Sequence, residues 1–349
     1  MSRVPVAIVG GSGYTGAELL RILLRHPRVE VAAVCARRSA GERIADVFPH
    51  LAGVVDRTVE PFDAAEVAAR AEVALCALPH GASAPIVAAL RERGVAVVDL
   101  SADFRLRDPA AYAEWYGPHP HPELIGGAVY GLPERYRDRL RGAALIAAPG
   151  CYPTSALLAI APLLAAGLVR GDDLIVDAKS GASGAGREPG LATHLPEAGE
   201  GIRAYKVGGA HRHIPEIEQE LAAIAGGAPR IVFTPHLVPM SRGIFTCVYA
   251  VPTERDRPEA DYRAAVDAAY AAEPFITVLP AGRVPDTAHV RGSNRAHVNV
   301  CVDRRAGRVL AMCAIDNLGK GASGQAVQCL NAARGWPETD GLDAPPVFP

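Results

Sequence analysis

Cys151 is the residue of this sequence whose surroundings best suit a nucleophile. It lies in Pro149-Gly150-Cys151-Tyr152-Pro153-Thr154, between a strand-like segment and the apolar run 155–160. Proline is favoured in the first turn of a helix, so this order of residues predicts Cys151 at or beside a helix N-terminus. Unpaired N–H groups and the helix dipole stabilise an anion there, and the thiolate is the reactive form of cysteine. The alternative interpretation is a small, inert core cysteine.

Two histidines are the candidates for a base that acts with this cysteine. They stand in His211-Arg212-His213-Ile214-Pro215-Glu216, ahead of a helix predicted to run to about Ala225. Pro215 and the acidic residues mark the first turn, so both histidines belong to the loop before the helix. Three interpretations stay open: metal ligands, although no further ligand set stands nearby; surface or supporting groups; or a base that holds the Cys151 thiolate and transfers protons.

A glycine-rich turn near the start of the chain predicts a dinucleotide site. The buried-strand pattern Val4–Val9 is followed by Gly10-Gly11-Ser12-Gly13-Tyr14-Thr15-Gly16 and then by a helical pattern over 17–25. Gly11, Gly13 and Gly16 match the G-x-G-x-x-G spacing, and Gly10 offers an alternative register. Between a strand and a helix, the backbone N–H groups of such a loop bind a pyrophosphate. The alternative is a tight turn without a ligand.

The end of the second predicted strand, 29–34, indicates which dinucleotide is bound. NAD enzymes usually have Asp or Glu there for the ribose 2′-hydroxyl, whereas a 2′-phosphate requires cations. The segment here is Cys35-Ala36-Arg37-Arg38-Ser39, with two arginines and no acid. We therefore predict NADP(H). The alternative is that Arg37 and Arg38 form only a solvated, charged turn.

The elements that must position these residues alternate between strand and helix in the first half of the chain. Strand patterns over 72–78, 95–100 and 143–148 accompany a helical pattern over 84–93, and the proline-rich, aromatic segment 109–136 predicts a long irregular insertion. This alternation predicts an α/β fold with a Rossmann-type doubly wound parallel sheet. Ligands bind beyond the carboxyl ends of such strands, where His80, Arg105 and Cys151 fall.

After the Cys151 helix the pattern changes mostly to strands. They are predicted at 173–178, 230–234, 244–251, 275–279, 296–303 and 308–315, the last two as a hairpin around 304–307. Because helices do not separate each pair of strands, we predict an α+β domain with a mainly antiparallel sheet. Two glycine-rich stretches, 179–187 and 316–328, are predicted to be loops, the second leading to a final helix that ends near Ala333.

Length and composition suit a two-domain enzyme of the cytoplasm. The 349 residues predict a first domain, 1–150, completed by 317–349, and a second domain, 151–316. A net charge of −2 gives no reason to expect nucleic acid or a membrane as partner. No apolar run reaches the ~18 residues of a transmembrane helix, and Met1-Ser2-Arg3-Val4 does not begin a signal peptide. Seven cysteines without a C-x-x-C pair indicate reduced thiols and no zinc site.

These motifs, in this order, resemble the N-acetyl-γ-glutamyl-phosphate reductases, the arginine-biosynthesis branch of the aspartate-semialdehyde dehydrogenase-like group. The resemblance covers nearly the whole chain, and no motif position departs from the family pattern. It rests on the segments 10–16, 149–154, 183–187, 211–217, 235–239, 320–328 and 335–339.

The resemblance implies that Cys151 attacks an acyl phosphate and that NADPH reduces the resulting thioester to a semialdehyde. It implies His211 as general acid/base, with His213 as the alternative, and a homodimer or homotetramer formed through the second domain's sheet. It further implies Arg105, Ser183 and Gly184 as substrate-binding residues; the alternative for Arg105 is a charged loop residue. The predicted cofactor-binding residues are Gly10, Gly11, Ser12, Gly13, Tyr14, Thr15, Gly16, Arg37, Arg38, Ser39, Leu78, Pro79, Ser180, Gly181 and Asn317.

Two other functions remain open from the sequence. A sister reductase of lysine synthesis would apply the same chemistry to a carrier-linked aminoadipyl or glutamyl phosphate. A non-catalytic Rossmann-fold nucleotide sensor would bind the dinucleotide alone, but a sensor needs no nucleophile such as Cys151.

Overall fold

The computed structural model describes residues 3–349. Met1 and Ser2 lie outside the described residues. The sequence predicts that they belong to the first domain and to a segment without a signal peptide. One compact unit comprises Met1–Pro149 and Ala322–Ala344, and the other comprises Gly150–Gly321 and Pro345–Pro349. The predicted division differs, because it gave 317–321 and 345–349 to the first domain. The tail belongs to the second unit because the Val347 N–H donates to the carbonyl of Arg291 at 2.8 Å.

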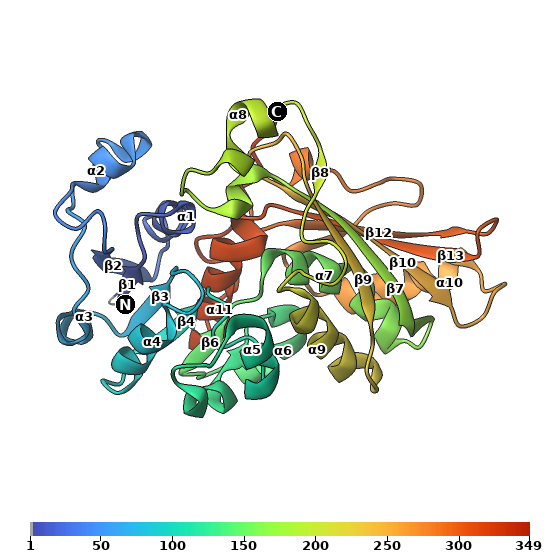
Figure 1. Cartoon of the computed structure of the whole chain (residues 1–349), viewed down its shortest axis with the longest axis horizontal. Coiled ribbons are helices and arrows are strands. Elements are labelled where there is room, and N and C mark those ends of the chain that lie inside the picture. Colours follow the sequence, from blue (N-terminus) through green and yellow to red (C-terminus); the bar gives the residue numbers. More distant parts are fainter. Residues whose placement is uncertain (1–2) are drawn as a thin grey trace. The chain divides into compact units, whose positions relative to one another are not determined.

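The first unit is built on a six-stranded sheet in the order β2-β1-β3-β4-β6-β5 (Figure 1). Every pair of neighbours is parallel, which confirms the predicted Rossmann-type sheet. The strands are β1 (Val4–Val9), β2 (Val29–Cys35), β3 (Val73–Cys76), β4 (Ala96–Asp99), β5 (Val129–Tyr130) and β6 (Leu145–Ala147). The helices are α1 (Tyr14–Leu23), α2 (Ile44–Val47), α3 (Ala64–Arg70), α4 (Ala84–Arg91), α5 (Pro109–Tyr116), α6 (Pro133–Leu140) and α11 (Gly324–Arg334).

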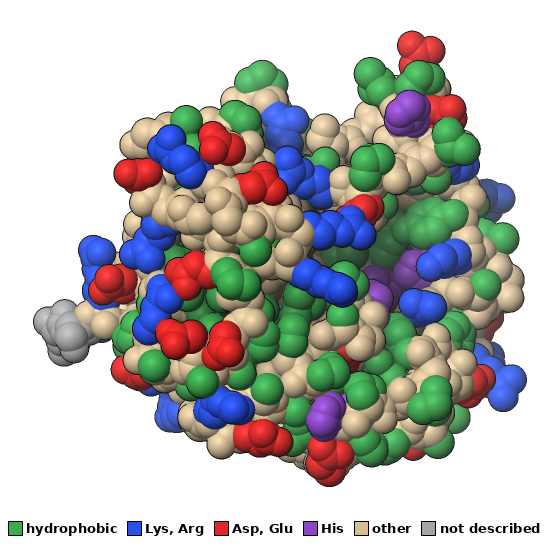
Figure 2. Space-filling view, turned by 60° about the vertical axis from the view of Figure 1, so that its left-hand side comes forward, with side chains coloured by type: hydrophobic (Ala, Val, Ile, Leu, Met, Phe, Trp, Pro, Cys, Tyr) green, Lys and Arg blue, Asp and Glu red, His purple; other side chains and the backbone are tan. Residues whose placement is uncertain are grey.

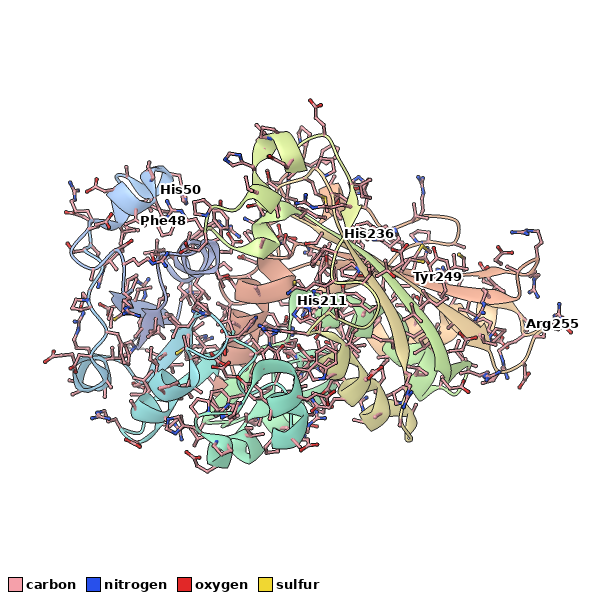
Figure 3. The ribbon with its side chains drawn as sticks, in the orientation of Figure 1. Phe48, His50, His211, His236, Tyr249 and Arg255 are labelled. Atoms are coloured by element: carbon pink, nitrogen blue, oxygen red, sulfur yellow. The ribbon has the colours of Figure 1, made fainter. Side chains whose placement is uncertain are left out.

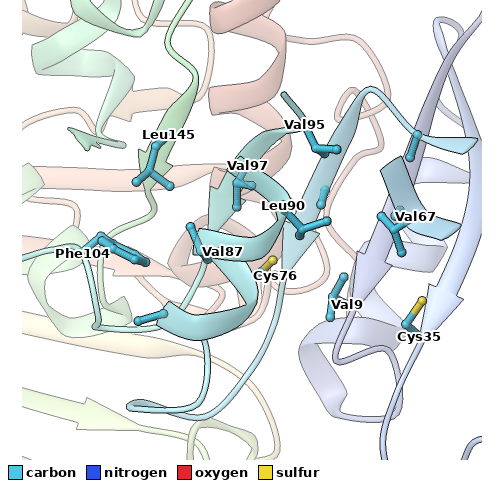
Figure 4. Close-up of a cluster of buried hydrophobic side chains, with 14 of the residues drawn as sticks. Val9, Cys35, Val67, Cys76, Val87, Leu90, Val95, Val97, Phe104 and Leu145 are labelled. Carbon is cyan, nitrogen blue, oxygen red and sulfur yellow. The ribbon is translucent and has the colours of Figure 1, made fainter. Parts of the chain in front are cut away.

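A buried apolar cluster holds the strands of this sheet against helix α4 (Figure 4). Val9, Cys76, Val87, Leu90 and Val97 belong to it, and each is at most 1% exposed. Both faces of a parallel sheet are covered, so its strands are continuous apolar runs rather than alternating ones. Burial of each valine or leucine stabilises the fold by about 1.5–3 kcal/mol. The cluster therefore anchors the strands whose ends carry the cofactor loops.

The segment 109–136 is not the irregular insertion that its composition predicts. It contains α5, a 3-10 helix (Pro122–Gly127), β5 and the first turn of α6. Its prolines are misleading because Pro109, Pro122 and Pro133 each stand in the first turn of a helix. A missing N–H costs no hydrogen bond there. Asp108 caps α5 by accepting the N–H of Ala110 at 2.9 Å.

The second unit contains a seven-stranded sheet in the order β11-β12-β13-β10-β7-β9-β8 (Figure 1). The pairs β11–β12 and β7–β9 are parallel and the other neighbours are antiparallel, which confirms a mainly antiparallel sheet and the hairpin around 304–307. The strands are β7 (Val169–Ser180), β8 (Arg203–Ala204), β9 (Ile231–Leu237), β10 (Ile244–Pro252), β11 (Ile276–Val278), β12 (Ala296–Asp303) and β13 (Arg308–Ile315).

Helices α7 (Cys151–Ala165), α9 (Ile214–Ala225) and α10 (Glu259–Tyr270) pack on this sheet, and a short helix α8 (Leu195–Ala198) precedes β8. The Tyr270 hydroxyl joins α10 to α7 by donating to the carbonyl of Leu158 at 2.7 Å. Helix α10 is missing from the predicted elements, although Tyr262, Val266 and Tyr270 recur at helical spacing and are buried. The charged and alanine residues between them weaken the periodic apolar pattern that would predict a helix.

The stretch 316–328, predicted to be a loop, is largely helical. A π-helical turn (Gly319–Ser323) leads directly into α11. The Asp316 carboxylate accepts the N–H groups of Leu318 at 2.8 Å and Gly319 at 2.9 Å. It therefore caps the start of this helical stretch, which the small residues after it had indicated to be a loop. This cap joins residues only two and three positions apart, and composition alone does not reveal it.

The surface carries no strong bias of charge. Figure 2 shows acidic and basic side chains interspersed over the face it presents. Within residues 3–349, none of the helices combines the length and apolar character that crossing a bilayer requires.

Candidate active site

The loop between β1 and α1 depends on glycine for two different reasons. Gly10 has φ +89°, and a Cβ there would lie 2.3 Å from the carbonyl oxygen of Ala77. A Cβ at Gly16 would lie 2.5 Å from the carbonyl oxygen of Gly11. These glycines let the chain pack closely upon itself. At Gly13, in contrast, a Cβ would meet no described atom within 4 Å, so the space beside it is open.

This open space lies at the start of helix α1. Gly13 is the N-cap, and no side chain of the described residues caps the helix. The first-turn N–H groups of Tyr14, Thr15 and Gly16 therefore lie at the positive end of the helix dipole without a side-chain cap among the described residues. A phosphate is the group that such a helix start favours. The loop accordingly fits the pyrophosphate of a dinucleotide.

The remaining predicted cofactor residues of the first unit adjoin this loop. The carbonyl of Cys35 accepts the N–H groups of Gly10 at 2.8 Å and Gly11 at 3.0 Å, so the turn with Arg37, Arg38 and Ser39 starts beside the loop. Both arginines are exposed. On the other side, a Cβ at Gly10 would come within 3.2 Å of Cδ2 of Leu78, which precedes Pro79.

Cys151 is the first residue of helix α7, with Gly150 as its N-cap. The thiol is half-buried, unlike the fully buried Cys35, Cys76, Cys247, Cys313 and Cys329. The N–H of Gly150 donates to Oε1 of Glu216 at 2.8 Å, and Glu216 is only 1% exposed. The local prediction of a helix start is therefore right, and Cys151 is not fully buried.

His211 lies in an aromatic cluster beside the loop that leads into α9 (Figure 3). Its ring centroid is 5.7 Å from that of Tyr152, 5.7 Å from that of Tyr205 and 5.0 Å from that of Phe233. The ring of His213 is 4.8 Å away, and the backbone N–H of His213 donates to Nδ1 of His211 at 3.1 Å. Because Nδ1 accepts this hydrogen bond, the neutral ring carries its proton on Nε2.

Burial controls the protonation of this cluster. Desolvation, with a smaller effect of the Lys206 cation, lowers the pKa of His211 to about 4. Burial likewise raises the pKa of Tyr205 to about 12, and the charge of Cys151 contributes in the same direction. Tyr205 also donates to the hydroxyl oxygen of Tyr152 at 3.0 Å. Tyr152 follows Cys151 in the chain, and the rings of both tyrosines lie beside that of His211.

The predicted residues of the second glycine-rich loop lie together in the second unit. Ser180 ends β7, and a Cβ at Gly184 would lie 3.2 Å from its hydroxyl. The amide of Asn317 donates to the Ser183 hydroxyl at 2.9 Å and accepts the N–H of Gly243 at 2.7 Å. Gly181 lies beside this group, since its N–H donates to the Gly243 carbonyl at 2.9 Å. Asn317 therefore holds the loop through both ends of its side chain.

Hydrogen bonds to backbone carbonyls of the first unit hold the side chain of Arg105. It is 6% exposed, and its guanidinium donates from Nε to the Ala148 carbonyl at 2.8 Å and from Nη2 to the Leu100 carbonyl at 2.7 Å. These hydrogen bonds tie the chain after β4 to the chain after β6. His80 is similarly engaged, because its Nδ1 accepts the N–H of Ala102 at 2.9 Å.

Four residues of the cluster were not predicted to belong to the site. Tyr152, Tyr205 and Phe233 supply the aromatic surroundings of His211, and Glu216 holds the N-cap of the Cys151 helix. The sequence marks Glu216 only as an acidic residue of a helix's first turn, and its partner 66 residues away is a tertiary contact. For metals, the part of the chain that the structure describes holds no group of three or more His, Cys, Asp or Glu side chains suited to an ion.

Two family models match the chain, one over each half. Residues 5–143 match the NAD binding domain of semialdehyde dehydrogenase, and residues 151–317 match its dimerisation domain. The chain belongs to the semialdehyde dehydrogenase family.

Full-length relatives narrow the similarity further. The chain is 51% identical over 346 residues to the N-acetyl-gamma-glutamyl-phosphate reductase of Citrifermentans bemidjiense, covering 99% of this chain and 100% of that protein. It is 50% identical over 347 residues to the protein of the same name from Moorella thermoacetica, with 99% and 100% covered.

Solved structures share the fold at lower identity. Aspartate semialdehyde dehydrogenase II from Vibrio cholerae matches with a TM-score of 0.71 and 20% identity, covering 95% of this chain and 98% of that one. Aspartate semialdehyde dehydrogenase with NADP from Candida albicans matches with a TM-score of 0.70 and 17% identity, with 95% and 98% covered.

Proposed function

We propose that this chain reduces N-acetyl-γ-glutamyl phosphate to N-acetylglutamate 5-semialdehyde and phosphate with NADPH, a step of arginine biosynthesis. The observation that carries the proposal is a half-buried cysteine at a helix start, followed directly by Tyr152, whose ring lies 5.7 Å from that of the buried His211. It occurs in a chain 51% identical over its whole length to a reductase of that name.

Cys151 acts first. Its thiolate attacks the acyl carbon of the substrate, and a carbon–sulfur bond forms. The bond from carbon to the phosphate oxygen breaks, and phosphate leaves with the electron pair, so the acyl group remains as a thioester on Cys151. Backbone N–H groups at the start of α7 point toward the oxyanion that develops in this step and stabilise it.

NADPH, when bound, supplies the hydride that reduces the thioester carbon. In this second stage His211 stabilises the negative oxygen through its Nε2–H, because its Nδ1 is already occupied by the N–H of His213. As the carbon–sulfur bond breaks, an electron pair of that oxygen forms the aldehyde carbonyl and the thiolate of Cys151 is regenerated. His213 is the alternative residue for the acid/base role.

The cofactor site of this proposal includes the glycine loop, the Leu78-Pro79 segment and the arginine turn. Arg37 and Arg38 would bind the 2′-phosphate of NADPH, since both are exposed beside the loop. The double variant Arg37→Ala/Arg38→Ala tests this, with exposed Arg25→Ala as control. We expect the ratio of kcat/KM for NADPH over NADH to fall at least about tenfold, or 1.4 kcal/mol. An unchanged ratio would reject the assignment.

Ser183 and Gly184 are proposed to contact the substrate, and Ser180, Gly181 and Asn317 are proposed as cofactor-binding residues. Arg105 stays a candidate for phosphate binding, although the hydrogen bonds to Leu100 and Ala148 account for its burial. The enzyme is proposed to act in the cytoplasm as a homodimer or homotetramer. Phe245 and Tyr249 support an interface through the sheet, because they lie half-buried on the face of β10 opposite the buried Ile244 and Val248.

The deciding experiment is phosphate-dependent reduction of NADP⁺ by N-acetylglutamate semialdehyde, with a Cys151→Ser variant beside the wild type. We expect activity in the wild type and loss of at least about 10³-fold in the variant. Full activity of the variant would exclude the thioester. Activity confined to a carrier-linked aminoadipyl or glutamyl substrate would instead favour the lysine-synthesis reaction, and binding of NADPH without turnover of either substrate would favour a sensor.

A further inference from the structure

Gly321 packs directly against the nucleophile. A Cβ at this position would lie 2.9 Å from Cβ of Cys151, 3.4 Å from its Cα and 3.2 Å from the carbonyl oxygen of Asp316. The obstructing atoms belong to backbone or are attached directly to it, so they cannot rotate away as a flexible side chain would. Any larger residue at 321 must therefore displace the start of helix α7, where Cys151 stands.

The backbone of Gly321 is held in place by a π-helical turn. Its N–H donates to the carbonyl of Asp316 at 2.9 Å, which spans five residues as a π turn requires. The Asp316 side chain is fully buried and forms an ion pair with Arg242, with Nε 2.9 Å from Oδ2 and Nη2 3.0 Å from Oδ1. It also accepts the N–H of Gly292 at 2.6 Å. One carboxylate thus joins the turn to two other loops of the second unit.

Neighbouring residues restrain the same turn on its other sides. A Cβ at Gly319 would lie 2.1 Å from the carbonyl oxygen of Ser293, so the two backbones are in contact. Lys320 is fully buried, with Nζ 5.9 Å from the ring centroid of Phe275. A lysine and an aspartate buried within five residues are costly to desolvate, and stability alone seldom requires such groups.

We infer that the segment Asp316–Gly321 positions the nucleophile: Gly321 sets where the Cys151 thiol stands at the start of α7, and the Asp316–Arg242 ion pair sets where Gly321 stands. This inference rests on the proposed function, because it assigns the segment a role in the reaction of Cys151. A nucleophile misplaced by about 1 Å lowers the rate about 10²-fold. Substrate binding elsewhere in the site is unaffected, so the loss falls on kcat rather than on KM.

The test compares Gly321→Ala with Gly171→Ala. The latter is a matched control in the same unit, where a Cβ would make only an ordinary contact of 3.6 Å with Leu164. We expect kcat of Gly321→Ala to fall about 10²-fold with KM within about twofold. Alkylation of Cys151 by iodoacetamide, followed by peptide mass mapping, is expected to slow about fivefold as the thiol leaves the helix start. Values of kcat and alkylation rate like those of Gly171→Ala would overturn the inference.

Variants of the Asp316–Arg242 ion pair provide a second test, which applies even if Gly321→Ala does not fold. Asp316→Asn keeps the size of the side chain, and Arg242→Lys keeps the charge but not the two-pronged geometry. We expect both to lower kcat with KM unchanged, and Arg242→Lys to retain more activity than Arg242→Ala. Equal activity of Arg242→Lys and Arg242→Ala, or a loss confined to KM, would contradict the positioning role. The alkylation readout needs no substrate, so failure of the proposed reaction would not obscure it.

Discussion

The backbone N–H of His213 donates a hydrogen bond of 3.1 Å to Nδ1 of His211. This contact distinguishes the roles of two histidines that sequence reasoning cannot separate. It leaves Nε2 as the nitrogen of His211 that faces other groups, with the proton on Nε2 in the neutral ring. His211 is also the more buried of the two, at 8% exposure. This geometry supports the proposal that His211 is the acid/base and that the backbone of His213 orients its ring.

Stability should depend on pH through His211. Its pKa is about 4 in the folded chain, against 6.5 for an ordinary histidine. Between these values the unfolded chain binds a proton that the folded chain does not, so stability falls as the pH drops from about 6.5 toward 4. From pH 7 to pH 5 this amounts to about 2 kcal/mol. We expect His211→Gln to remove that part of the pH dependence of the free energy of unfolding. The control variant, at the exposed His50, is His50→Gln, which should keep it. Equal pH dependence in wild type and His211→Gln would refute the effect.

The loss of kcat on substitution should distinguish the roles of His211 and His213. We expect His211→Gln to lower kcat about 10²–10⁴-fold, the range for loss of an acid/base or oxyanion-stabilising group. His213→Gln keeps the backbone N–H that bonds to Nδ1, so its loss of kcat should be at least about tenfold smaller. Steady-state kinetics with saturating NADPH measures both. A larger loss in His213→Gln would transfer the acid/base role to His213.

The glycines of the cofactor loop should separate into structural and ligand-binding positions. Gly10→Ala forces a Cβ to 2.3 Å from the Ala77 oxygen at φ +89°, so we expect the thermal midpoint of the cofactor-free protein to fall clearly. Gly13→Ala meets no atom of the described chain within 4 Å and should leave that midpoint unchanged. It should nevertheless weaken NADPH binding at least about tenfold, because the added methyl occupies the pyrophosphate's approach. Calorimetric titration with NADPH checks this, and undiminished affinity would disprove it.

Arg105 should be needed for stability whether or not it binds phosphate. In Arg105→Met the buried carbonyls of Leu100 and Ala148 lose their donors, at a cost of about 2–4 kcal/mol in the free energy of unfolding. Exposed Arg107, which donates to the Tyr136 hydroxyl at 3.1 Å, serves as control; Arg107→Met should change stability by less than about 1 kcal/mol. Urea unfolding measures both. Unchanged stability together with a raised KM for phosphate in the reverse reaction would favour the phosphate-binding role instead.

Local signals in the sequence suffice for much of this protein. The buried strands of the first sheet, the glycine spacing at 10–16 and the placement of Cys151 at a helix start depend on residues within about ten positions of one another. The errors concern residues whose local signals fit more than one structure. Pro109, Pro122 and Pro133 indicate irregular chain until each is found in the first turn of a helix, and the glycines after Asp316 indicate a loop until its carboxylate is found to cap them.

The sequence by itself determined the two kinds of sheet, the glycine-rich turn between β1 and α1 and the place of Cys151 at a helix start, because periodicity, turn chemistry and helix-start rules act over short stretches of chain. Only the tertiary structure decided which groups surround Cys151. Glu216 at the Gly150 N–H, Gly321 behind Cys151 and the tyrosines beside His211 come from elements far apart in sequence. Their distances and burial follow from the packing of the second unit, and burial is what sets the charge of His211.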